Sequence, residues 1–349
     1  MYGENYGYRS SLNKSMVEHL HKKIHKLEEL VDLKETDLVL DIGSNDATSL
    51  KGYKTKCERV GIDPTSKKFK KYYTDGIKNI DDFFSKQVFS NLYPERKAKI
   101  ITSIAMFYDL ESPIDFARDV MAVLADDGVW HFEQSYMPLM LEMNAYDTIC
   151  HEHLEFYSLE VIKRIVETVG MHIINVEKNN INGGSFAITA AKLDAPYSVN
   201  ANIIDKMLLE ERKLGLDSVA GYMNFARKVE QHSVEFRNLI KKLSVNYKVF
   251  GYGASTKGNV LLQYCGITRK MMPYIVEVNE EKFGANTPGT NIPIISEMEG
   301  ELMRPDYYVV LPWHFKSNIL PRVREILDRG AKFIFPLPDI KIIGKEDIK

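Results

Sequence analysis

The sequence predicts an α/β protein with two doubly wound, largely parallel units joined by a helical stretch. Three observations support this fold class. The chain has 349 residues, which corresponds to about two domains of ordinary size. Short apolar runs alternate with helical patterns, as they do in βαβ units. A Gly-containing loop follows a strand-like run twice, at Gly43 and again at Gly253.

The first unit begins with an amphipathic helix and continues with strands. Apolar residues recur every three or four positions over residues 9–31, and Ser10 or Ser11 is the expected N-cap. Strand-like runs then alternate with helical stretches, which predicts a mainly parallel sheet. The expected strands are 38–42, 58–62, 98–102, 128–133, 172–177 and a last strand within 184–192.

The second half of the chain has a helical pattern first and a pattern of alternating strands and helices after it. Residues 203–245 show helical spacing and no strand signal, which predicts two helices or one long bent helix. Further strands are expected near 247–252, 273–277, 306–311 and 332–335. The predicted domains are residues 1–200, a helical bridge over 201–245, and a smaller α/β domain over 246–349.

Composition narrows the class of protein. The chain has 46 Lys and Arg against 48 Asp and Glu, which argues against a strongly basic nucleic-acid binder. No apolar run approaches the ~18 residues of a membrane span, and the first residues lack a signal-peptide pattern. Three widely spaced cysteines, Cys57, Cys150 and Cys265, argue against a disulfide framework or a four-cysteine zinc site. We expect a cytoplasmic enzyme with neither nucleic-acid nor membrane partners, for which an oligomer stays open.

The first Gly-containing loop indicates a cofactor with an adenosine group. Small residues at positions 43–45 let a ligand approach the backbone, but a single glycine is a poor match to a dinucleotide fingerprint. Asp63 ends the next strand, where an acid can bind both ribose hydroxyls. A third strand-end group, residues 79–84, can offer a carboxylate to an exocyclic amine and an aromatic face to a purine. A Gly-containing loop, a ribose acid and an adenine acid in this order predict S-adenosylmethionine (SAM), and a plain core turn with solvated acids is the alternative. The predicted cofactor-binding residues are Asp41, Gly43, Ser44, Asn45, Asp63, Asp82, Phe83 and Ser103.

The densest group of titratable side chains is His151-Glu152-His153. A histidine with a pKa near ~6.5 takes up a proton close to neutral pH, and a neighbouring carboxylate orients the imidazole. Three interpretations stay open: a general base, a metal site in which both imidazoles share one face, and a hydrogen-bonded cluster under aromatic side chains. No further ligand at suitable spacing is visible, so we expect no bound metal.

A second Gly-containing loop, 251–254, precedes a helical stretch that starts near Thr256 and Lys257. A Gly-rich turn before a helix, with a lysine beside it, can hold a phosphate, and a plain turn with a solvated lysine is the alternative. The loop is not a P-loop, because the Gly-Lys-Ser/Thr order is absent. Trp313 and Glu133 lie at other strand ends, where the sites of α/β proteins gather.

Motifs along nearly the whole chain occur in the order of one known family. They are Tyr6-Gly7-Tyr8-Arg9-Ser10-Ser11, Ile42-Gly43-Ser44-Asn45-Asp46, Asp82-Phe83-Phe84, Asp147-Thr148-Ile149 with His151-Glu152-His153, Asn182-Gly183-Gly184-Ser185, Gly251-Tyr252-Gly253-Ala254 with Lys257-Gly258-Asn259, Pro288-Gly289-Thr290 with Ile292-Pro293-Ile294, and Leu311-Pro312-Trp313 with Phe315. With these motifs the chain resembles the nucleotide-sugar methyltransferases, whose best-known members C-methylate dTDP-keto-deoxysugars.

The resemblance implies a class I SAM-methyltransferase domain, then a Rossmann-like C-terminal domain, and a nucleotide-linked sugar as substrate. It implies that His153 is the general base, that Glu152 is its neighbouring carboxylate, and that Tyr8 donates to an oxyanion. The predicted catalytic residues are His153, Glu152, His151 and Tyr8, and the predicted substrate contacts are Tyr6, Glu133, Tyr146, Asn182, Thr256, Lys257 and Trp313.

The chain departs from the pattern of that family in three places. Typical members carry an N-terminal zinc-binding domain with several cysteines, whereas this sequence starts close to the Tyr6-Gly7-Tyr8 motif. Cys150 stands where the C-methyltransferases have a tyrosine, and Phe107 stands where they have a histidine. In the C-methyltransferases that tyrosine and histidine would handle the keto sugar, and this chain has neither at these positions. Methylation of a ring carbon and of a hydroxyl therefore both stay open.

We therefore predict SAM-dependent methylation of a nucleotide-linked deoxysugar or heptose in carbohydrate biosynthesis. An alternative is an NAD-dependent sugar-nucleotide oxidoreductase or epimerase that uses the 251–258 loop, with Glu277 as its ribose acid. A third alternative, a non-catalytic SAM-sensing or scaffold protein, is disfavoured by the intact His-Glu-His cluster.

Overall fold

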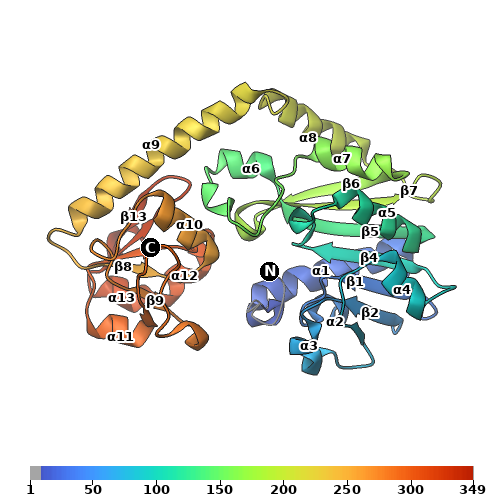
Figure 1. Ribbon diagram of the computed structural model, residues 1–349, viewed down its shortest axis with the longest axis horizontal. Helices are drawn as coiled ribbons and strands as arrows, with labels where there is room; N and C mark the ends of the chain where they lie inside the picture. Colours follow the sequence, from blue (N-terminus) through green and yellow to red (C-terminus); the bar gives the residue numbers. More distant parts are fainter. Residues whose placement is uncertain (1–8, 349) are drawn as a thin grey trace. The chain divides into compact units, whose positions relative to one another are not determined.

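The computed structural model describes residues 9–348, apart from the side chain of Asn182. The predicted site residues Tyr6 and Tyr8 lie outside the described residues. The chain forms two compact α/β units, labelled by element in Figure 1. Unit 1 holds the residues up to Tyr136 together with Leu154–Glu211, and unit 2 holds Met137–His153 together with the chain from Arg212 onward.

Unit 1 contains a sheet with the order β3-β2-β1-β4-β5-β7-β6 within the described residues. The strands are β1 (Leu38–Ile42), β2 (Glu58–Ile62), β3 (Lys78–Ile80), β4 (Ala98–Ile104), β5 (Leu124–Ser135), β6 (Met171–Asn179) and β7 (Ser185–Lys192). β7 runs antiparallel to both of its neighbours, and the other pairs are parallel. The carboxyl ends of β1, β2 and β3 therefore share one edge.

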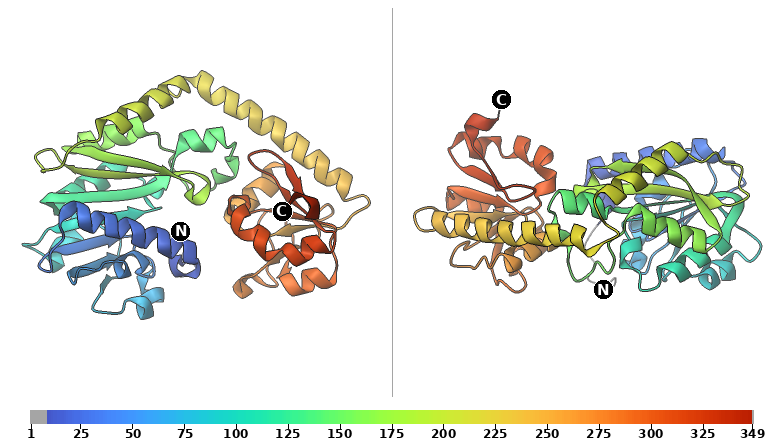
Figure 2. Two further views of the ribbon diagram at one scale, coloured as in Figure 1. Left: turned by 180° about the vertical axis from the view of Figure 1, so that it is seen from behind. Right: turned by 90° about the horizontal axis from the view of Figure 1, so that it is seen from above.

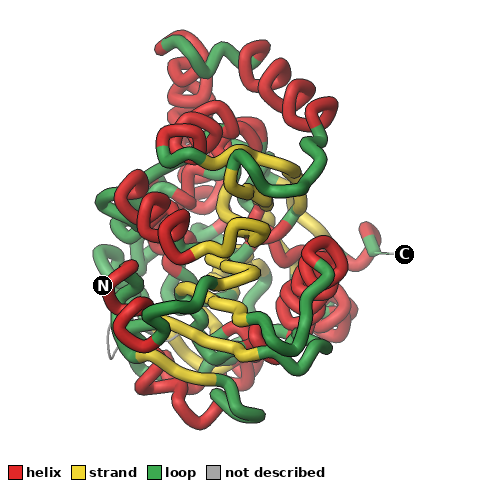
Figure 3. Tube along the Cα trace, turned by 90° about the vertical axis from the view of Figure 1, so that its right-hand side faces the viewer, coloured by secondary structure: helices red, strands yellow, loops and turns green. Residues whose placement is uncertain are grey.

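Helices cover the strands on both sides, as the red and yellow layers of Figure 3 show. The helices of unit 1 are α1 (Lys14–Val31), α2 (Thr48–Lys51), α3 (Ser66–Phe69), α4 (Lys86–Leu92), α5 (Pro113–Val123), α7 (Leu159–Thr168) and most of α8 (Ala201–Lys213). The fold class predicted for this half of the chain, a doubly wound α/β domain, is confirmed.

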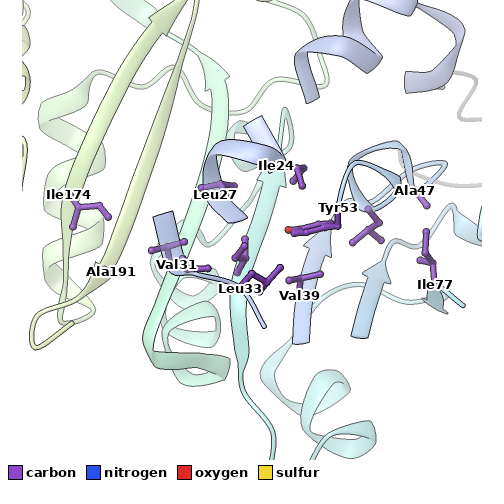
Figure 4. Close-up of a cluster of buried hydrophobic side chains, with 13 residues drawn as sticks. Ile24, Leu27, Val31, Leu33, Val39, Ala47, Tyr53, Ile77, Ile174 and Ala191 are labelled. Atoms are coloured by element: carbon purple, nitrogen blue, oxygen red, sulfur yellow. The ribbon is translucent and has the colours of Figure 1, made fainter. Parts of the chain in front are cut away.

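Helix α1 packs its apolar face on the sheet of unit 1. Figure 4 shows Ile24, Leu27 and Val31 beside Val39 of β1. Their spacing of three or four residues places them on one face, and each is buried. Three further residues of this cluster, Ile100, Val129 and Ala191, come from β4, β5 and β7.

The predicted N-cap of this first helix is wrong. The side chain of Asn13 accepts a hydrogen bond from the backbone N–H of Ser15 at 3.1 Å, so Asn13 is the N-cap of α1. Ser10 and Ser11 lie in a preceding 3₁₀ turn, where their backbone N–H groups donate to the side chains of Asn45 and Asp46 at 3.1 Å. The serines are used for a tertiary contact with the first Gly-containing loop, which local sequence does not reveal.

Unit 2 contains a second, smaller sheet with the order β10-β9-β8-β11-β12-β13 within the described residues. Its strands are β8 (Val249–Tyr252), β9 (Ile275–Glu277), β10 (Ile294–Ser296), β11 (Tyr307–Val310), β12 (Lys332–Phe335) and β13 (Lys341–Ile343), of which β13 is antiparallel to β12. Its helices are α6 (Met137–Glu142), α9 (Val219–Leu243), α10 (Thr256–Tyr264), α11 (Glu297–Leu302), α12 (Lys316–Arg322) and α13 (Arg324–Asp328).

The predicted helical stretch consists of two helices, α8 and α9, separated by residues 214–218. Figure 2 shows α9 as the long yellow helix that leads into the orange and red strands of unit 2. The compact units divide the chain elsewhere than the domain boundaries that we expected at 200 and 245. Residues 137–153 belong to unit 2, because their 3₁₀ turn Tyr146–Thr148 packs against α10.

We expect Leu27→Ala in α1 to lower the free energy of unfolding by about 2–5 kcal/mol, because it opens a cavity in the cluster of Figure 4. Denaturant unfolding monitored by circular dichroism measures this loss. Leu30→Ala is the matched control on the same helix, since Leu30 is 44% exposed, and it should change the value by no more than about 0.5 kcal/mol. Equal losses for the two variants would contradict the packing described here.

Candidate active site

The loop after β1 in unit 1 has the backbone shape of a tight ligand-binding turn. Gly43, Asn45 and Ala47 all have positive φ, at 72°, 49° and 60°. Gly43 also lies close to Met106, whose Cγ would be 3.3 Å from a Cβ at this position. Glycine is therefore favoured at position 43 both by conformation and by space.

Asp63, at the carboxyl end of β2, holds this loop in place. Its Oδ2 accepts a hydrogen bond from the backbone N–H of Asn45 at 2.8 Å. Its Oδ1 accepts from both the N–H and the hydroxyl of Thr65 at 2.6 Å. A carboxylate has about four acceptor positions, so one remains for a further donor such as a ribose hydroxyl.

Ser44 and Asn45 are joined through Tyr73. The Tyr73 hydroxyl donates to the backbone carbonyl of Asn45 at 2.9 Å and lies 2.7 Å from Ser44 Oγ. Since the phenol has one proton, Ser44 is the donor in the second bond. The three groups fix the loop from the side of β2, where a side chain on Gly61 would collide with Ser44.

Two of the predicted cofactor residues lie inside the sheet. Burial raises the pKa of Asp41 to about 7, against the effect of a hydrogen bond from Thr102. Ser103 is fully buried, and its hydroxyl accepts a hydrogen bond from the Trp130 indole at 3.0 Å. These side chains stabilise the base of the loop rather than its open edge.

Asp82 and Phe83 follow β3 and are exposed, with 64% of Phe83 accessible to solvent. Because β1, β2 and β3 are neighbours, the loop at Gly43, Asp63 and the Asp82-Phe83 pair lie along one edge of the sheet. The predicted adenosine-binding residues are thus brought together at this edge, with the exceptions of Asp41 and Ser103. Phe107, after β4, is fully buried among aromatic rings.

Glu133, a predicted substrate contact, pairs instead with α1. Its carboxylate lies 2.7 Å from His19 Nε2 and 2.7 Å from Lys23 Nζ, and it accepts from Asn179 Nδ2 at 2.5 Å. Burial alone would raise the pKa of Glu133, but His19 and Lys23 lower it to about 2. Glu133 is therefore an ionised structural anchor, and nothing in the sequence around it identifies its partners.

The His-Glu-His segment lies in unit 2 and forms a turn. The backbone N–H of His153 donates to the carbonyl of Cys150 at 3.2 Å. His153 Nδ1 lies 2.8 Å from the backbone carbonyl of Thr148. A carbonyl can only accept, so Nδ1 carries a proton and Nε2 holds the lone pair of the neutral ring.

The surroundings of His153 keep its imidazole neutral. Burial lowers the pKa of His153 below its usual 6.5, and the positive charge of Lys257 acts in the same direction. The hydrogen bond to Thr148 and the charge of Glu152 oppose this shift. Near pH 7 the ring is therefore unprotonated and can accept a proton at Nε2. His151, in contrast, is exposed.

The turn that precedes this segment is anchored at Asp147. Asp147 is fully buried, and its Oδ2 accepts a hydrogen bond from the Trp313 indole at 2.7 Å. Burial raises the pKa of Asp147, while the ammonium group of Lys257 and the Trp313 bond oppose the rise. Trp313 and Lys257, both predicted as substrate contacts, thus interact with Asp147, which the sequence singled out only as part of a motif.

Tyr146 supplies a second anchor of the same turn. Its hydroxyl lies 3.0 Å from His232 Nδ1 and 3.1 Å from Cys265 Sγ, while His232 Nε2 is 2.6 Å from the carbonyl of Pro336. The carbonyl makes Nε2 the donor, so Tyr146 donates to Nδ1 and accepts from the thiol. The Tyr146 hydroxyl is consequently hydrogen-bonded inside unit 2, and its role as a substrate contact stays a prediction.

The second Gly-containing loop, like the first, is held by a carboxylate at the end of the neighbouring strand. Glu277, at the end of β9, accepts from the backbone N–H groups of Ala254, Val278 and Asn279 at 2.9, 2.8 and 3.1 Å, and pairs with Lys282 at 3.3 Å. These donors occupy the acceptor positions that a dinucleotide ribose would need. Thr256 is exposed at the start of α10.

Comparison with known proteins identifies the family of this chain. A family model for a methyltransferase domain matches residues 14–176, and a model for a C-methyltransferase C-terminal domain matches residues 180–338. The C-methyltransferase NovU of Streptomyces niveus is 30% identical over 344 residues, which cover 98% of this chain and 82% of that protein. The chain belongs to the C-methyltransferase family. This C-methyltransferase family member is an enzyme, and its cofactor is SAM.

Solved structures with a similar fold include other methyltransferases. An S-adenosylmethionine-dependent methyltransferase from Clostridium acetobutylicum is 14% identical, with a TM-score of 0.39 over 50% of this chain and 92% of that chain. The plantazolicin methyltransferase BpumL, in complex with a pentazolic desmethylPZN analog and SAH, is 11% identical, with a TM-score of 0.39 over 50% and 83%.

The comparisons confirm the predicted methyltransferase and its cofactor, and they give no support to the oxidoreductase alternative. In the described residues 9–348, no helix has both the length and the apolar character needed to cross a bilayer.

The hydrogen-bond and ion-pair partners of Tyr146 and Glu133 were not predicted from the sequence. The side chain of Asn182 lies outside what the structure describes.

We expect Trp313→Phe to lower the free energy of unfolding by about 1–3 kcal/mol, because it leaves Asp147 Oδ2 buried without its donor. Urea unfolding measures the loss. In an Asp147→Ala background the same substitution should cost clearly less, since the carboxylate is gone. The same loss in both backgrounds would contradict the assigned hydrogen bond.

Proposed function

We propose that this enzyme transfers a methyl group from SAM to a ring carbon beside the keto group of a nucleotide-linked sugar. The observation that carries the proposal is the state of His153: Nδ1 is bonded to Thr148, and the ring is kept neutral, so Nε2 is a directed base. The sugar substrate is supported by the resemblance of the sequence motifs to the nucleotide-sugar methyltransferases.

The residues at the carboxyl edge of β1–β3 fit SAM. The positive φ values of the Gly43 loop keep its backbone open, and Asp63 retains one acceptor position for a ribose hydroxyl. The exposed Phe83 ring offers an apolar face to adenine, and Asp82 offers a carboxylate to its amine. When bound, SAM supplies a methyl group activated by a positively charged sulfur.

His153 then acts on the acceptor. Nε2 takes the proton from the carbon next to the carbonyl, and the electron pair of that C–H bond becomes available for the new carbon–carbon bond. Tyr8, which lies outside the described residues, is proposed to donate a hydrogen bond to the oxygen on which charge develops. A well-placed base contributes typically ~10²–10⁴-fold to the rate.

Neighbouring groups are proposed to tune this base and to bind the substrate. Glu152 stabilises the imidazolium that forms, and Lys257 favours the neutral ring before reaction. Exposed Thr256, at the first turn of α10, is proposed to contact a phosphate of the nucleotide. His151, Tyr6, Asn182 and Trp313 remain proposed contributors without an assigned step.

Methylation of a sugar hydroxyl is the second candidate, and one observation favours it. Phe107 is fully buried in an aromatic cluster, so the turn after β4 presents no polar side chain at that position to an enolate. The same base would take the hydroxyl proton. Incubating the enzyme with SAM and a panel of nucleotide sugars, followed by mass spectrometry and NMR, distinguishes the two, because the new methyl carbon is bonded either to carbon or to oxygen.

We expect His153→Asn to lower turnover by at least ~100-fold while SAM binding is retained, because the base is lost and the edge of β1–β3 is untouched. Turnover is measured on the accepted nucleotide sugar, and SAM affinity by calorimetry. Lys270→Met, at an exposed position of unit 2, is the control and should behave like the wild type. Near wild-type turnover of His153→Asn would remove His153 from the catalytic role.

The acidic limb of kcat/KM should have its midpoint below pH 6.5. The folded-state pKa of His153 is lowered, so the base loses its proton, and becomes active, at a lower pH than an unperturbed histidine. The charged groups acting on it are Lys257, His151 and Glu152. Removing the cation in Lys257→Met should move the midpoint upward, whereas Lys257→Arg should keep it low. A midpoint that does not move would exclude this electrostatic effect.

A further inference from the structure

We propose that Cys150, Glu152 and His153 form a binding site for a divalent metal ion of the Zn²⁺ class. The turn closed by the bond from His153 N–H to the Cys150 carbonyl brings residues 150 and 153 side by side. One ligand atom from each of the three side chains lies within 4.8 Å of the others. Thiolate, carboxylate and imidazole are the ligand types that Zn²⁺ prefers.

The distances suit a tetrahedral ion. With a metal–sulfur bond of about 2.3 Å and a metal–oxygen bond of about 2.1 Å, the two ligand atoms are about 3.6 Å apart. Cys150 Sγ and Glu152 Oε1 are 3.9 Å apart, close to this separation, and a ligand atom of His153 lies within 4.8 Å of both. The three ligands leave one position for water or for an oxygen of the substrate.

The imidazole is already arranged as a ligand. Metal-bound histidines usually donate their second ring N–H to a carbonyl or carboxylate, which fixes the ring and the tautomer. His153 has this arrangement, because Nδ1 is bonded to the Thr148 carbonyl at 2.8 Å. We therefore assign the metal bond to Nε2.

The charge of the ligands and the exposure of the site are also compatible with a bound divalent ion. A thiolate and a carboxylate together balance a 2+ ion, so the occupied site is formally neutral. It therefore does not repel the ammonium group of Lys257, which interacts electrostatically with Cys150. Cys150, Glu152 and His153 are all partly exposed, so an ion can enter and leave.

Occupation of the site has a consequence that rests on the proposed function. A metal bound to Nε2 uses the lone pair with which His153 would accept a proton. Metal binding and base catalysis therefore exclude each other, and Zn²⁺ should inhibit methyl transfer reversibly. The binding itself does not depend on the proposed function.

Titration of the full-length protein with Co²⁺ tests the site. We expect one equivalent to bind and to produce the near-ultraviolet charge-transfer absorption of a thiolate–cobalt bond. Cys150→Ser should abolish this absorption, and Glu152→Gln and His153→Asn should each weaken binding by at least ~10-fold. Cys57→Ser is the matched control for the cysteine and His172→Asn, in unit 1, for the histidine, and both should keep the absorption and the affinity of the wild type.

Two results would overturn the proposed site. One is a Co²⁺ spectrum without thiolate absorption in the wild type, and the other is the same absorption in Cys150→Ser. Inhibition is a separate measurement: Zn²⁺ should lower turnover, a chelator should restore it, and Cys150→Ser should resist it relative to its own metal-free rate. Thiolate-ligated binding that depends on His153 but leaves turnover unchanged would support the metal site and contradict the base role of His153.

Discussion

The hydrogen bond from His153 Nδ1 to the carbonyl of Thr148 is the contact on which the proposed role of unit 2 depends. It selects the tautomer, and so it decides which ring nitrogen is basic. The carbonyl can do this only if the turn that carries it is fixed. Tyr146 and Asp147, the two residues before Thr148, hold the turn in place through His232 and Trp313. The orientation of the His153 imidazole therefore depends on contacts to parts of unit 2 that are distant in sequence.

The two Gly-containing loops are held by the same kind of hydrogen bond, but the carboxylate that accepts it is used differently in each unit. In each unit an acid at the end of the second strand accepts a backbone N–H of the loop: Asp63 from Asn45 and Glu277 from Ala254. Asp63 keeps an acceptor position, whereas Glu277 is saturated by two further amides and Lys282. The acid at this position is therefore available to a ribose in unit 1 and is fully used by the protein in unit 2.

Much of this organisation follows from sequence, because apolar periodicity and Gly-containing turns are local signals. Strands β3, β9, β10 and β13 carry three residues each, too few for a periodic pattern. Of these four, only β9 was among the strands expected from the sequence, and β3 was implied by the residues after it. The type of a residue indicated which chemistry its side chain could perform, but not which side chains it would contact. Tyr146 and Glu133 have the side chains of substrate contacts, yet the fold uses them internally, because His232 and Lys23 reach them from elements distant in sequence.

The features that support the proposed base role of His153 also support its proposed role as a metal ligand, since both roles need a neutral, oriented and partly exposed imidazole. What separates the roles is the charge around it. Lys257 opposes a bare cation on the imidazole, whether that cation is a proton or a metal. The Cys150 thiolate and the Glu152 carboxylate together carry two negative charges. These charges neutralise a divalent ion, whereas a single proton leaves one negative charge uncompensated. If both proposals hold, the thiol of Cys150 is the group that lets a metal ion compete with a proton for His153.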